Sequence, residues 1–243
     1  MESRSLLVSD VDGTLLGDDA AIARFAAWRR QRGEGVRLVY NSGRFFESVL
    51  ESVAASALPM PDAIIGGVGT NIRFCDTREA LDNWPDCTRN GWDAAAIRTI
   101  VGVHKELTPQ PDEFQSAHKI SFYGHDLPLA FVDLLDRQLK SLGYGVHLVY
   151  SSQRDLDVLP AGASKGTAAA RLAKHWGYAP HEVVVAGDTG NDLAMFEQGF
   201  LGIVVGNAHD DLRALRASNV YHATKLYADG VLEGLNYWLQ HVV

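Results

Sequence analysis

The sequence has only two cysteines, Cys75 and Cys87, among its 243 residues, and their spacing matches neither a CxxC motif nor a metal-binding pattern. We expect two free thiols in a reducing compartment rather than a disulfide framework. The sequence also lacks any run near the roughly 18 apolar residues that a membrane span requires. Its opening, MESRSLLVSD, holds too short an apolar run for a signal peptide, so we expect a cytoplasmic protein with no membrane partner.

Basic side chains are in the minority: 22 lysines and arginines face 30 aspartates and glutamates, which gives a formal net charge of −8. No basic stripe stands out, so nucleic acid is not an expected partner. An acidic protein binds a phosphate group through local cations or a metal, against its overall field. The sequence has no Gx4GK[ST] motif, which excludes a Walker-type nucleotide site.

Apolar and polar stretches alternate at both ends of the chain in a strand–helix rhythm. The expected strands cover residues 5–10, 36–40, 62–65, 182–186 and 202–205. The expected helices cover residues 19–32, 44–57, 164–176, 209–216 and 229–240. This alternation predicts right-handed crossovers and a parallel sheet.

The pattern changes near residue 80 and reverts after Pro160. Helices are expected there at 93–106 and 127–142, and strands at 118–123, 146–150 and 154–159. A short polar link joins the last two strands, which favours a small antiparallel sheet with helices on one face. We therefore expect an α/β protein with a Rossmann-like parallel-sheet core at residues 1–80 and 160–243, and a smaller inserted α/β domain at residues 81–159.

Two acids follow the first expected strand, in the stretch LLVSDVDGTLL. Asp10 and Asp12 lie where the strand ends, before Gly13 and Thr14. A charged group at the end of a buried strand must be solvated, paired or metal-bound, and open α/β sheets bind ligands at the carboxyl ends of their strands. Asp10 and Asp12 are therefore candidates for chemistry; the alternative is a helix-capping or turn-forming acid.

Further polar groups follow another strand or begin a helix. Ser42, with its own backbone amide and that of Gly43, can donate to a phosphate oxygen, or it can cap the following helix. Lys165 lies in the first turn of a helix, where the helix dipole costs roughly 0.3–1 kcal/mol. A bound anion would reverse that cost; otherwise Lys165 is a solvated surface lysine.

The densest cluster is GDTGND, at the end of a strong strand. Asp188 and Asp192 lie four residues apart with Asn191 beside them, so both acids can point to one spot. Carboxylate oxygens of this kind suit Mg²⁺, although a loop acid followed by a helix cap would have the same sequence. With the groups above, the cluster suits phosphoryl transfer to an aspartate, in which Mg²⁺ and the lysine neutralise the phosphate charge.

DVDGT, NSGR, an isolated lysine and GDTGND, in that order, resemble the four motifs of the haloacid dehalogenase superfamily of phosphatases. The inserted domain resembles the α/β cap of its type IIB members. Longer stretches, IIGGVGT, HKISFY, YSSQRDLDVLPAGASKG and GDTGNDLAMF, are similar to the family of sucrose-phosphate phosphatases and mannosylfructose-phosphate phosphatases. The resemblance covers most of the chain and is weakest over residues 75–115 and after residue 208.

The resemblance implies a role for each motif residue. Asp10 would attack phosphorus and carry an aspartyl-phosphate, while Asp12 would protonate the leaving oxygen and then deprotonate water. Ser42 and Lys165 would hold the transferring phosphoryl group, which Asn191 would help to position. Mg²⁺ would be bound by Asp10, Asp12 (through its backbone carbonyl), Asp188 and Asp192.

Selection of the substrate falls to the cap, because the core motifs are blind to the leaving group. The resemblance implies that Lys119 lies in the sugar pocket, although a lysine in HKISF can equally lie on a solvated face. Polar residues of the expected hairpin can bind sugar hydroxyls or simply form the turn. The expected substrate-binding residues are Ser42, Gly43, Thr70, Asn71, Lys119, Arg154, Asp157, Lys165 and Asn191.

The resemblance implies Mg²⁺-dependent hydrolysis of a disaccharide phosphate, with sucrose 6-phosphate first and mannosylfructose phosphate second. A phosphosugar mutase of the same superfamily, which returns the phosphoryl group to the sugar, stays an alternative. A signalling receiver domain is another, although the inserted domain and the late GDTGND count against it. A cognate glycosyl-phosphate synthase is an expected partner, and a monomer is the expected state.

Overall fold

The computed structural model describes residues 5–86 and 91–241, and the chain forms two compact units. One unit joins the residues up to Leu81 to those from Lys165 onward, and the other spans Asp82–Ser164. The cysteine at position 87 lies outside the described residues. Cys75 has a free thiol whose pKa is raised to about 12, first by burial and then by neighbouring acids. That thiol is therefore protonated at neutral pH.

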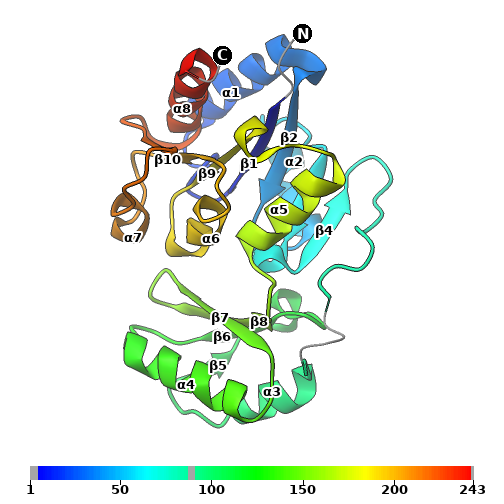
Figure 1. Cartoon of the computed structure of the whole chain (residues 1–243), viewed down its shortest axis with the longest axis vertical. Helices are drawn as coiled ribbons and strands as arrows, with labels where there is room; N and C mark the ends of the chain where they lie inside the picture. The colour runs from blue at the N-terminus through cyan, green and yellow to red at the C-terminus, as the bar shows by residue number, and fades with distance from the viewer. Residues whose placement is uncertain (1–4, 87–90, 242–243) are drawn as a thin grey trace. The chain divides into compact units, whose positions relative to one another are not determined.

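The first unit is built on a seven-stranded sheet with the strand order β11-β10-β9-β1-β2-β3-β4 (Figure 1). All neighbouring pairs are parallel except β3 and β4. Consecutive residues of β1 and β9 are buried, so both faces of the sheet are covered there, and the expected parallel α/β core is confirmed. The strands are β1 (Ser5–Ser9), β2 (Val36–Asn41), β3 (Ala63–Gly66), β4 (Asn71–Phe74), β9 (Val183–Gly187), β10 (Leu201–Val204) and β11 (Val220–His222).

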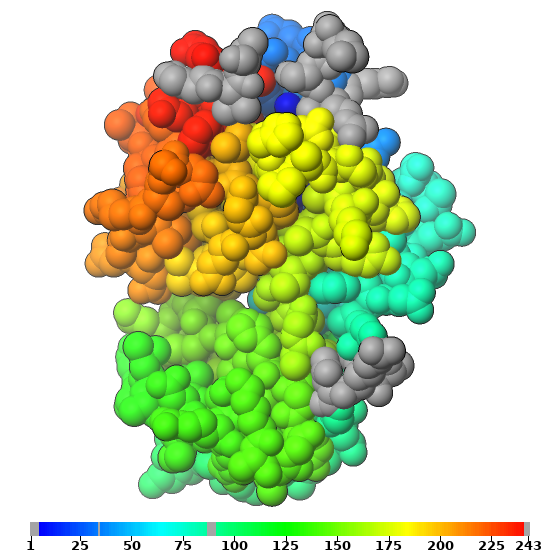
Figure 2. Space-filling view, viewed as in Figure 1, coloured from blue at the N-terminus to red at the C-terminus, as the bar shows by residue number. Residues whose placement is uncertain are grey.

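The helices of this unit are α1 (Asp19–Arg32), α2 (Phe46–Ala55), α5 (Lys165–His175), α6 (Leu193–Phe196), α7 (Asp210–Arg213) and α8 (Tyr227–His241). Asp18 caps α1, because its carboxylate accepts a hydrogen bond from the Ala21 amide. The first and last helices, α1 and α8, pack side by side (Figure 1). In Figure 2 the N-terminal (blue) and C-terminal (orange to red) segments accordingly share one surface. Within the described ranges, no helix is long and apolar enough to cross a membrane.

Parallel pairing brings several strand ends to one edge of the sheet. β1 lies between β2 and β9, with Ser9 opposite Tyr40 on one side and Ala186 on the other. The segments that follow these three residues leave the sheet side by side, at the edge where such sheets bind ligands. These segments carry Asp10 and Asp12, Ser42, and the GDTGND run.

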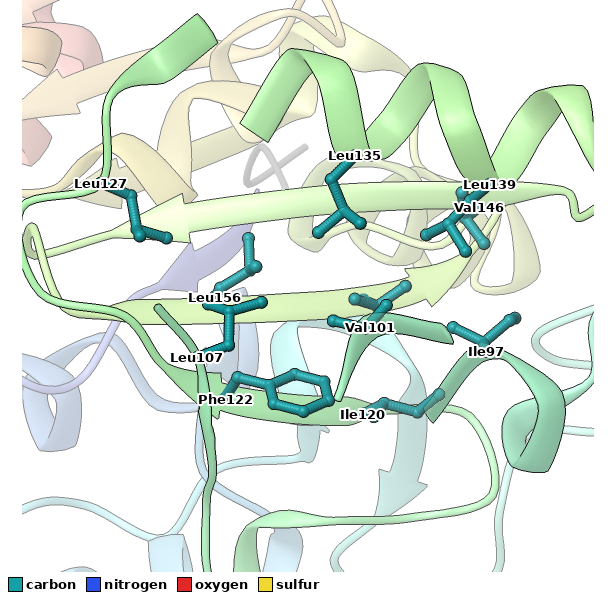
Figure 3. Close-up of a cluster of buried hydrophobic side chains, with 11 residues drawn as sticks. Ile97, Val101, Leu107, Ile120, Phe122, Leu127, Leu135, Leu139, Val146 and Leu156 are labelled. Atoms are coloured by element: carbon teal, nitrogen blue, oxygen red, sulfur yellow. The ribbon is translucent and has the colours of Figure 1, made fainter. Parts of the chain in front are cut away.

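The second unit contains a four-stranded antiparallel sheet in the order β5-β6-β8-β7. Its strands are β5 (Thr108–Pro109), β6 (Ile120–Tyr123), β7 (Val146–Ser151) and β8 (Asp155–Pro160), and its helices are α3 (Ala94–Val101) and α4 (Leu129–Ser141). Figure 3 shows the apolar cluster between helices and sheet, to which α4 contributes Leu135 and β6 contributes Ile120 and Phe122. Ser121 and Asp157 alternate with such apolar residues along β6 and β8 and therefore lie on the opposite face.

The second junction between the units lies at residues 164/165, later than the expected boundary at 159/160. Pro160 is still paired with Val146 in the β7–β8 hairpin, and the Ala161 amide donates to the Gly145 carbonyl. These contacts keep residues 160–164 with the inserted unit. The helix expected at 93–106 is also shorter, because α3 ends at Val101.

Candidate active site

Asp10 lies directly after β1, at the carboxyl edge of the sheet. Its backbone amide donates to the Ala186 carbonyl of β9 at 2.9 Å, which extends the sheet pairing past the strand end. Its Oδ1 accepts a hydrogen bond from Lys165 Nζ at 2.6 Å. The side chain is 7% exposed, so the fold itself fixes this carboxylate.

Lys165 is the cation at the centre of the site, and its side chain is 1% exposed. Besides Asp10, its ammonium group donates to Asn191 Oδ1 at 2.9 Å and to Asp192 Oδ1 at 2.7 Å. An ammonium group has three donors, and all three have an acceptor here. The alternative of a solvated surface lysine is therefore wrong.

Two contacts place the start of α5, and with it Lys165. A Cβ at Gly166 would lie 1.8 Å from the Ala194 carbonyl oxygen, so only glycine allows α5 to approach α6 this closely. Asn41, at the end of β2, donates through Nδ2 to the Lys165 carbonyl at 2.9 Å. Neither contact has a local sequence signal, because both join residues far apart in the chain.

Asp188 and Asp192 form a group of three buried carboxylates with Asp10. One carboxylate oxygen from each residue lies within 4.8 Å of those of the other two. Thr14 holds Asp188, because its hydroxyl donates to Asp188 Oδ1 at 2.8 Å. Asp192 Oδ2 accepts the backbone amides of Asp188 and Thr189 at 3.0 and 3.1 Å. Hydrogen bonds within the GDTGND segment thus fix its conformation, and its two carboxylates lie close to that of Asp10.

Burial raises the pKa of all three carboxyl groups to about 6. Against burial, the ammonium group of Lys165 lowers the pKa of Asp10 and Asp192. The charge of Asp192 raises the pKa of Asp188 further. Burial lowers the pKa of Lys165, but Asp10 and Asp192 together raise it by more, so the lysine is charged at neutral pH.

The donor set of this cluster fits a divalent cation. When all groups are ionised, three carboxylates and one ammonium group leave two negative charges uncompensated. Buried charge of one sign is unfavourable unless it is paired or bound to a metal. Mg²⁺ prefers such oxygen ligands, takes one or two protein carboxylates and keeps several waters. The buried acidic triad is therefore chemically suited to Mg²⁺.

Ser42 lies one residue beyond β2 and is buried. Its amide donates to the Ile65 carbonyl at 2.8 Å, and its Oγ accepts the Arg44 amide at 3.1 Å. Neither contact uses the hydroxyl hydrogen, which can therefore be donated to a ligand. Since the N-cap of α2 is Phe45, the alternative that Ser42 caps this helix is wrong. The neighbouring Gly43 is open, because the nearest atom to a Cβ there would be 3.9 Å away.

Asp12 stands apart from the buried triad. Its side chain is 56% exposed, and its Oδ2 lies 2.9 Å from Arg44 Nε. The backbone around it is fixed by a turn in which the Leu15 and Leu16 amides donate to the Val11 carbonyl. Sequence reasoning did not single out Arg44, although NSGR contains it, because nothing local to that motif points to its partner.

Thr70 and Asn71 follow the glycine turn after β3. The Thr70 hydroxyl donates to the Gly67 carbonyl at 2.8 Å and so caps the turn. Val68, inside the turn, has a positive φ of 59°. Asn71 begins β4, opposite Gly66. The Thr70 hydroxyl is therefore used within the turn, and the roles of both residues in substrate binding stay predictions.

The second unit holds a separate buried cluster. Lys119 Nζ lies 2.8 Å from Asp157 Oδ1, and their side chains are only 4% and 8% exposed. The Ser121 hydroxyl joins them, since it accepts from Lys119 at 2.5 Å and donates to Asp157 at 2.6 Å. Arg154, by contrast, is exposed and pairs with Asp155. Ser121 was not predicted, because a single serine in an apolar strand carries no signal of its partners.

A parallel sheet with these motifs at its carboxyl edge, interrupted by an inserted α/β unit, is the fold of solved haloacid dehalogenase-like hydrolases. They share it at 16–19% sequence identity, a likeness that bears on the fold alone. The buried aspartate, lysine and carboxylate cluster fits a phosphatase of the haloacid dehalogenase superfamily, and the match of residues 3–239 to a phosphohydrolase family shows that class.

Residues 3–239 match the family model described as sucrose-6F-phosphate phosphohydrolase, and the chain belongs to that family. It is 37% identical to the mannosylfructose-phosphate phosphatase of Agrobacterium fabrum, over 98% of each chain. It is 32% identical to sucrose-phosphatase 1 of Nicotiana tabacum, over 97% of this chain and 59% of the tobacco protein. The solved sucrose-phosphatase of Synechocystis sp. PCC6803, in complex with sucrose and phosphate, is 29% identical with a TM-score of 0.91, over 97% of this chain and 98% of that one. The family implied by the sequence motifs is confirmed.

Proposed function

We propose that this phosphatase hydrolyses the phosphate monoester of a fructose-containing disaccharide with Mg²⁺, and that sucrose 6-phosphate is the first candidate substrate. The observation that carries the proposal is the buried Asp10–Lys165 pair beside the carboxylate cluster, in a member of the sucrose-6F-phosphate phosphohydrolase family. Asp10, Asp188 and Asp192 would hold Mg²⁺, together with the backbone carbonyl of Asp12. When bound, the cation supplies neutralisation of charge on the phosphate oxygens.

In the first half-reaction, a carboxylate oxygen of Asp10 attacks phosphorus, and the bond between phosphorus and the sugar oxygen breaks. Asp12 donates a proton to that oxygen, so the sugar leaves as an alcohol. Ser42 donates a hydrogen bond to a phosphoryl oxygen, and the positive charge of Lys165 stabilises the phosphoryl group in a site where burial strengthens both interactions. Asn191 orients the lysine, since its Oδ1 accepts one of the three ammonium hydrogens.

In the second half-reaction, water attacks phosphorus of the aspartyl-phosphate while Asp12 takes a proton from it. The bond to Asp10 breaks, and inorganic phosphate leaves. Acid–base catalysis of this kind contributes about 10²–10⁴-fold. The different exposure of the two acids fits these different roles. Asp10 is buried and held in place as the nucleophile. Asp12 is 56% exposed, so its carboxylate is accessible to water.

The second unit supplies the proposed sugar contacts. Lys119, Ser121 and Asp157 place two charged groups and a hydroxyl on the polar face of its sheet, and sugar hydroxyls are both donors and acceptors. Arg154 and Asn71 are weaker candidates for the same role.

Mannosylfructose phosphate is the second candidate substrate. The 37% identity to the Agrobacterium fabrum phosphatase, over nearly the whole of both chains, favours it. Both candidates contain fructose, so family membership alone does not separate them. For either one, a synthase that forms the glycosyl phosphate is the proposed partner.

The experiment that tests the proposal measures phosphate release from sucrose 6-phosphate, mannosylfructose phosphate and fructose 6-phosphate side by side, with Mg²⁺ and with EDTA. We expect kcat/KM for one disaccharide phosphate to exceed that for fructose 6-phosphate by about tenfold or more, and EDTA to abolish turnover. Equal, feeble release from all three would refute the proposed substrate class. Formation of an isomeric sugar phosphate without phosphate release would identify a mutase instead.

A further inference from the structure

Arg44 is a charged side chain that none of the roles above uses. It follows Ser42 and Gly43 and precedes α2, and its Nε lies 2.9 Å from Asp12 Oδ2. Asp12 is the proton carrier of the proposed reaction. A cation at this distance therefore influences where the carboxylate of Asp12 points.

The guanidinium group of Arg44 is anchored to α2. Its Nη1 donates to Ser52 Oγ at 2.8 Å and to the Ser48 carbonyl at 3.4 Å. The Arg44 side chain is 27% exposed, compared with 56% for Asp12. The guanidinium group is thus fixed in place, and the Asp12 carboxylate is the more exposed partner of the pair. The position of Arg44 therefore determines where the Asp12 carboxylate lies.

The contact between Arg44 and Asp12 is a close ion pair without the alignment of a hydrogen bond. Both Nε and Nη2 of Arg44 are buried, and neither has a hydrogen-bond partner among the described residues. Nε and Nη2 are a pair of donors with which a guanidinium group can bind a carboxylate in bidentate fashion, and the Asp12 carboxylate lies against one of them. Arg44 therefore has two donors available to hold the Asp12 carboxylate.

We propose that Arg44 is a positioning residue that acts through Asp12: it keeps the Asp12 carboxylate directed at the leaving-group oxygen and does not itself bind the phosphate. The inference rests on the proposed function for the acid–base role of Asp12. No bond or proton changes at Arg44 during the reaction. In this it differs from Lys165, which contacts the nucleophile Asp10 directly.

The basicity of the leaving group distinguishes this role from a structural one. A general acid matters for phenyl phosphate and little for 4-nitrophenyl phosphate, whose leaving group departs without a proton. We expect Arg44→Gln to lower kcat/KM for phenyl phosphate about 10- to 100-fold, and that for 4-nitrophenyl phosphate less than about threefold. Arg44→Lys, which keeps the charge but not the planar fork, should recover part of the loss.

The matched control is Arg73→Gln. Arg73 also lies against α2, where it pairs with Glu47 and its guanidinium covers the ring of Phe46. It has no contact with Asp12 among the described residues, so the ratio of kcat/KM for the two esters should stay at the wild-type value.

A second measurement places Arg44→Gln in an Asp12→Asn background. There it should change kcat/KM for 4-nitrophenyl phosphate by less than about twofold, because the residue through which it acts is gone. Equal losses for both esters, a full additional loss in the Asp12→Asn background, or a raised KM with unchanged kcat would overturn the proposal. Aryl esters need no sugar pocket. Failure of the wild type on disaccharide phosphates would therefore refute the proposed substrate and leave this test intact.

Discussion

Replacing Lys165 by methionine should make the stability of the metal-free protein depend strongly on pH. Methionine keeps an unbranched side chain and removes the charge. The ammonium group it removes is 1% exposed and donates to Asp10, Asn191 and Asp192. The substitution therefore leaves two buried carboxylates without their cation. Removing one partner of a buried ion pair costs about 3–5 kcal/mol.

The size of the effect follows from the charge state of the site. In a protein of this size, 1 kcal/mol changes the melting temperature by about 2–4 °C, so the expected loss in EDTA at pH 8 is about 6–20 °C. The carboxyl groups of the cluster have a pKa of about 6 in the wild type, and loss of the cation raises it further. Near pH 4.5 these groups are protonated in both proteins. The melting temperatures should then differ by only a few degrees, since no buried negative charge is left to compensate.

The assay is thermal unfolding followed by circular dichroism in EDTA, at both pH values. Lys174→Met is the matched control, because Lys174 lies in the same helix, α5, and is exposed. Its effect should stay within about 0.5 kcal/mol at either pH. An equal loss for Lys165→Met at both pH values, or no loss at pH 8, would refute charge compensation as the contribution of Lys165.

Three further predictions follow from the same contacts. The pKa of the clustered carboxyl groups is raised from 3.8 to about 6 on folding, so the folded protein binds more protons in that window. The stability of the metal-free wild type should therefore fall as pH rises from about 4 to 6, and Mg²⁺ should raise the melting temperature more at pH 8 than at pH 5; a pH-independent shift would contradict this. Gly166→Ala, whose Cβ would lie 1.8 Å from the Ala194 carbonyl oxygen, should lower melting temperature and kcat together, and an unchanged kcat would show that α5 placement is not critical. Leu156→Ala, in the core of the second unit, should destabilise that unit by about 2–5 kcal/mol. Faster amide exchange confined to residues 91–164 would support this, and uniform exchange across both units would contradict it.

The parts of the fold with strong local signals could be predicted from the sequence. β1 and β9 are apolar runs that end in acids, and parallel strands place their carboxyl ends at one edge. From these two facts, Asp10 and the GDTGND acids were expected together, and the structure brings one oxygen of each within 4.8 Å. The catalytic roles of these residues stay predictions.

The contacts that could not be predicted join residues with no local pattern. β5 is only Thr108–Pro109, and it exists because it pairs with β6. The end of the inserted unit depends on Pro160 pairing with Val146, and the Arg44–Asp12 ion pair depends on a turn and a helix meeting in three dimensions. Periodicity and turn signals concern residues that are close in sequence, so they do not predict contacts between residues far apart in the chain.

The central claim is that Asp10 carries the phosphoryl group during turnover. The most direct measurement is an acid quench of the enzyme turning over 4-nitrophenyl phosphate with Mg²⁺, followed by peptide mass spectrometry. We predict one phosphoryl group on the peptide that contains Asp10, labile to alkali, and none in Asp10→Asn. A phosphoryl group on another peptide, or Asp10→Asn turning over at a near-normal rate, would contradict the claim.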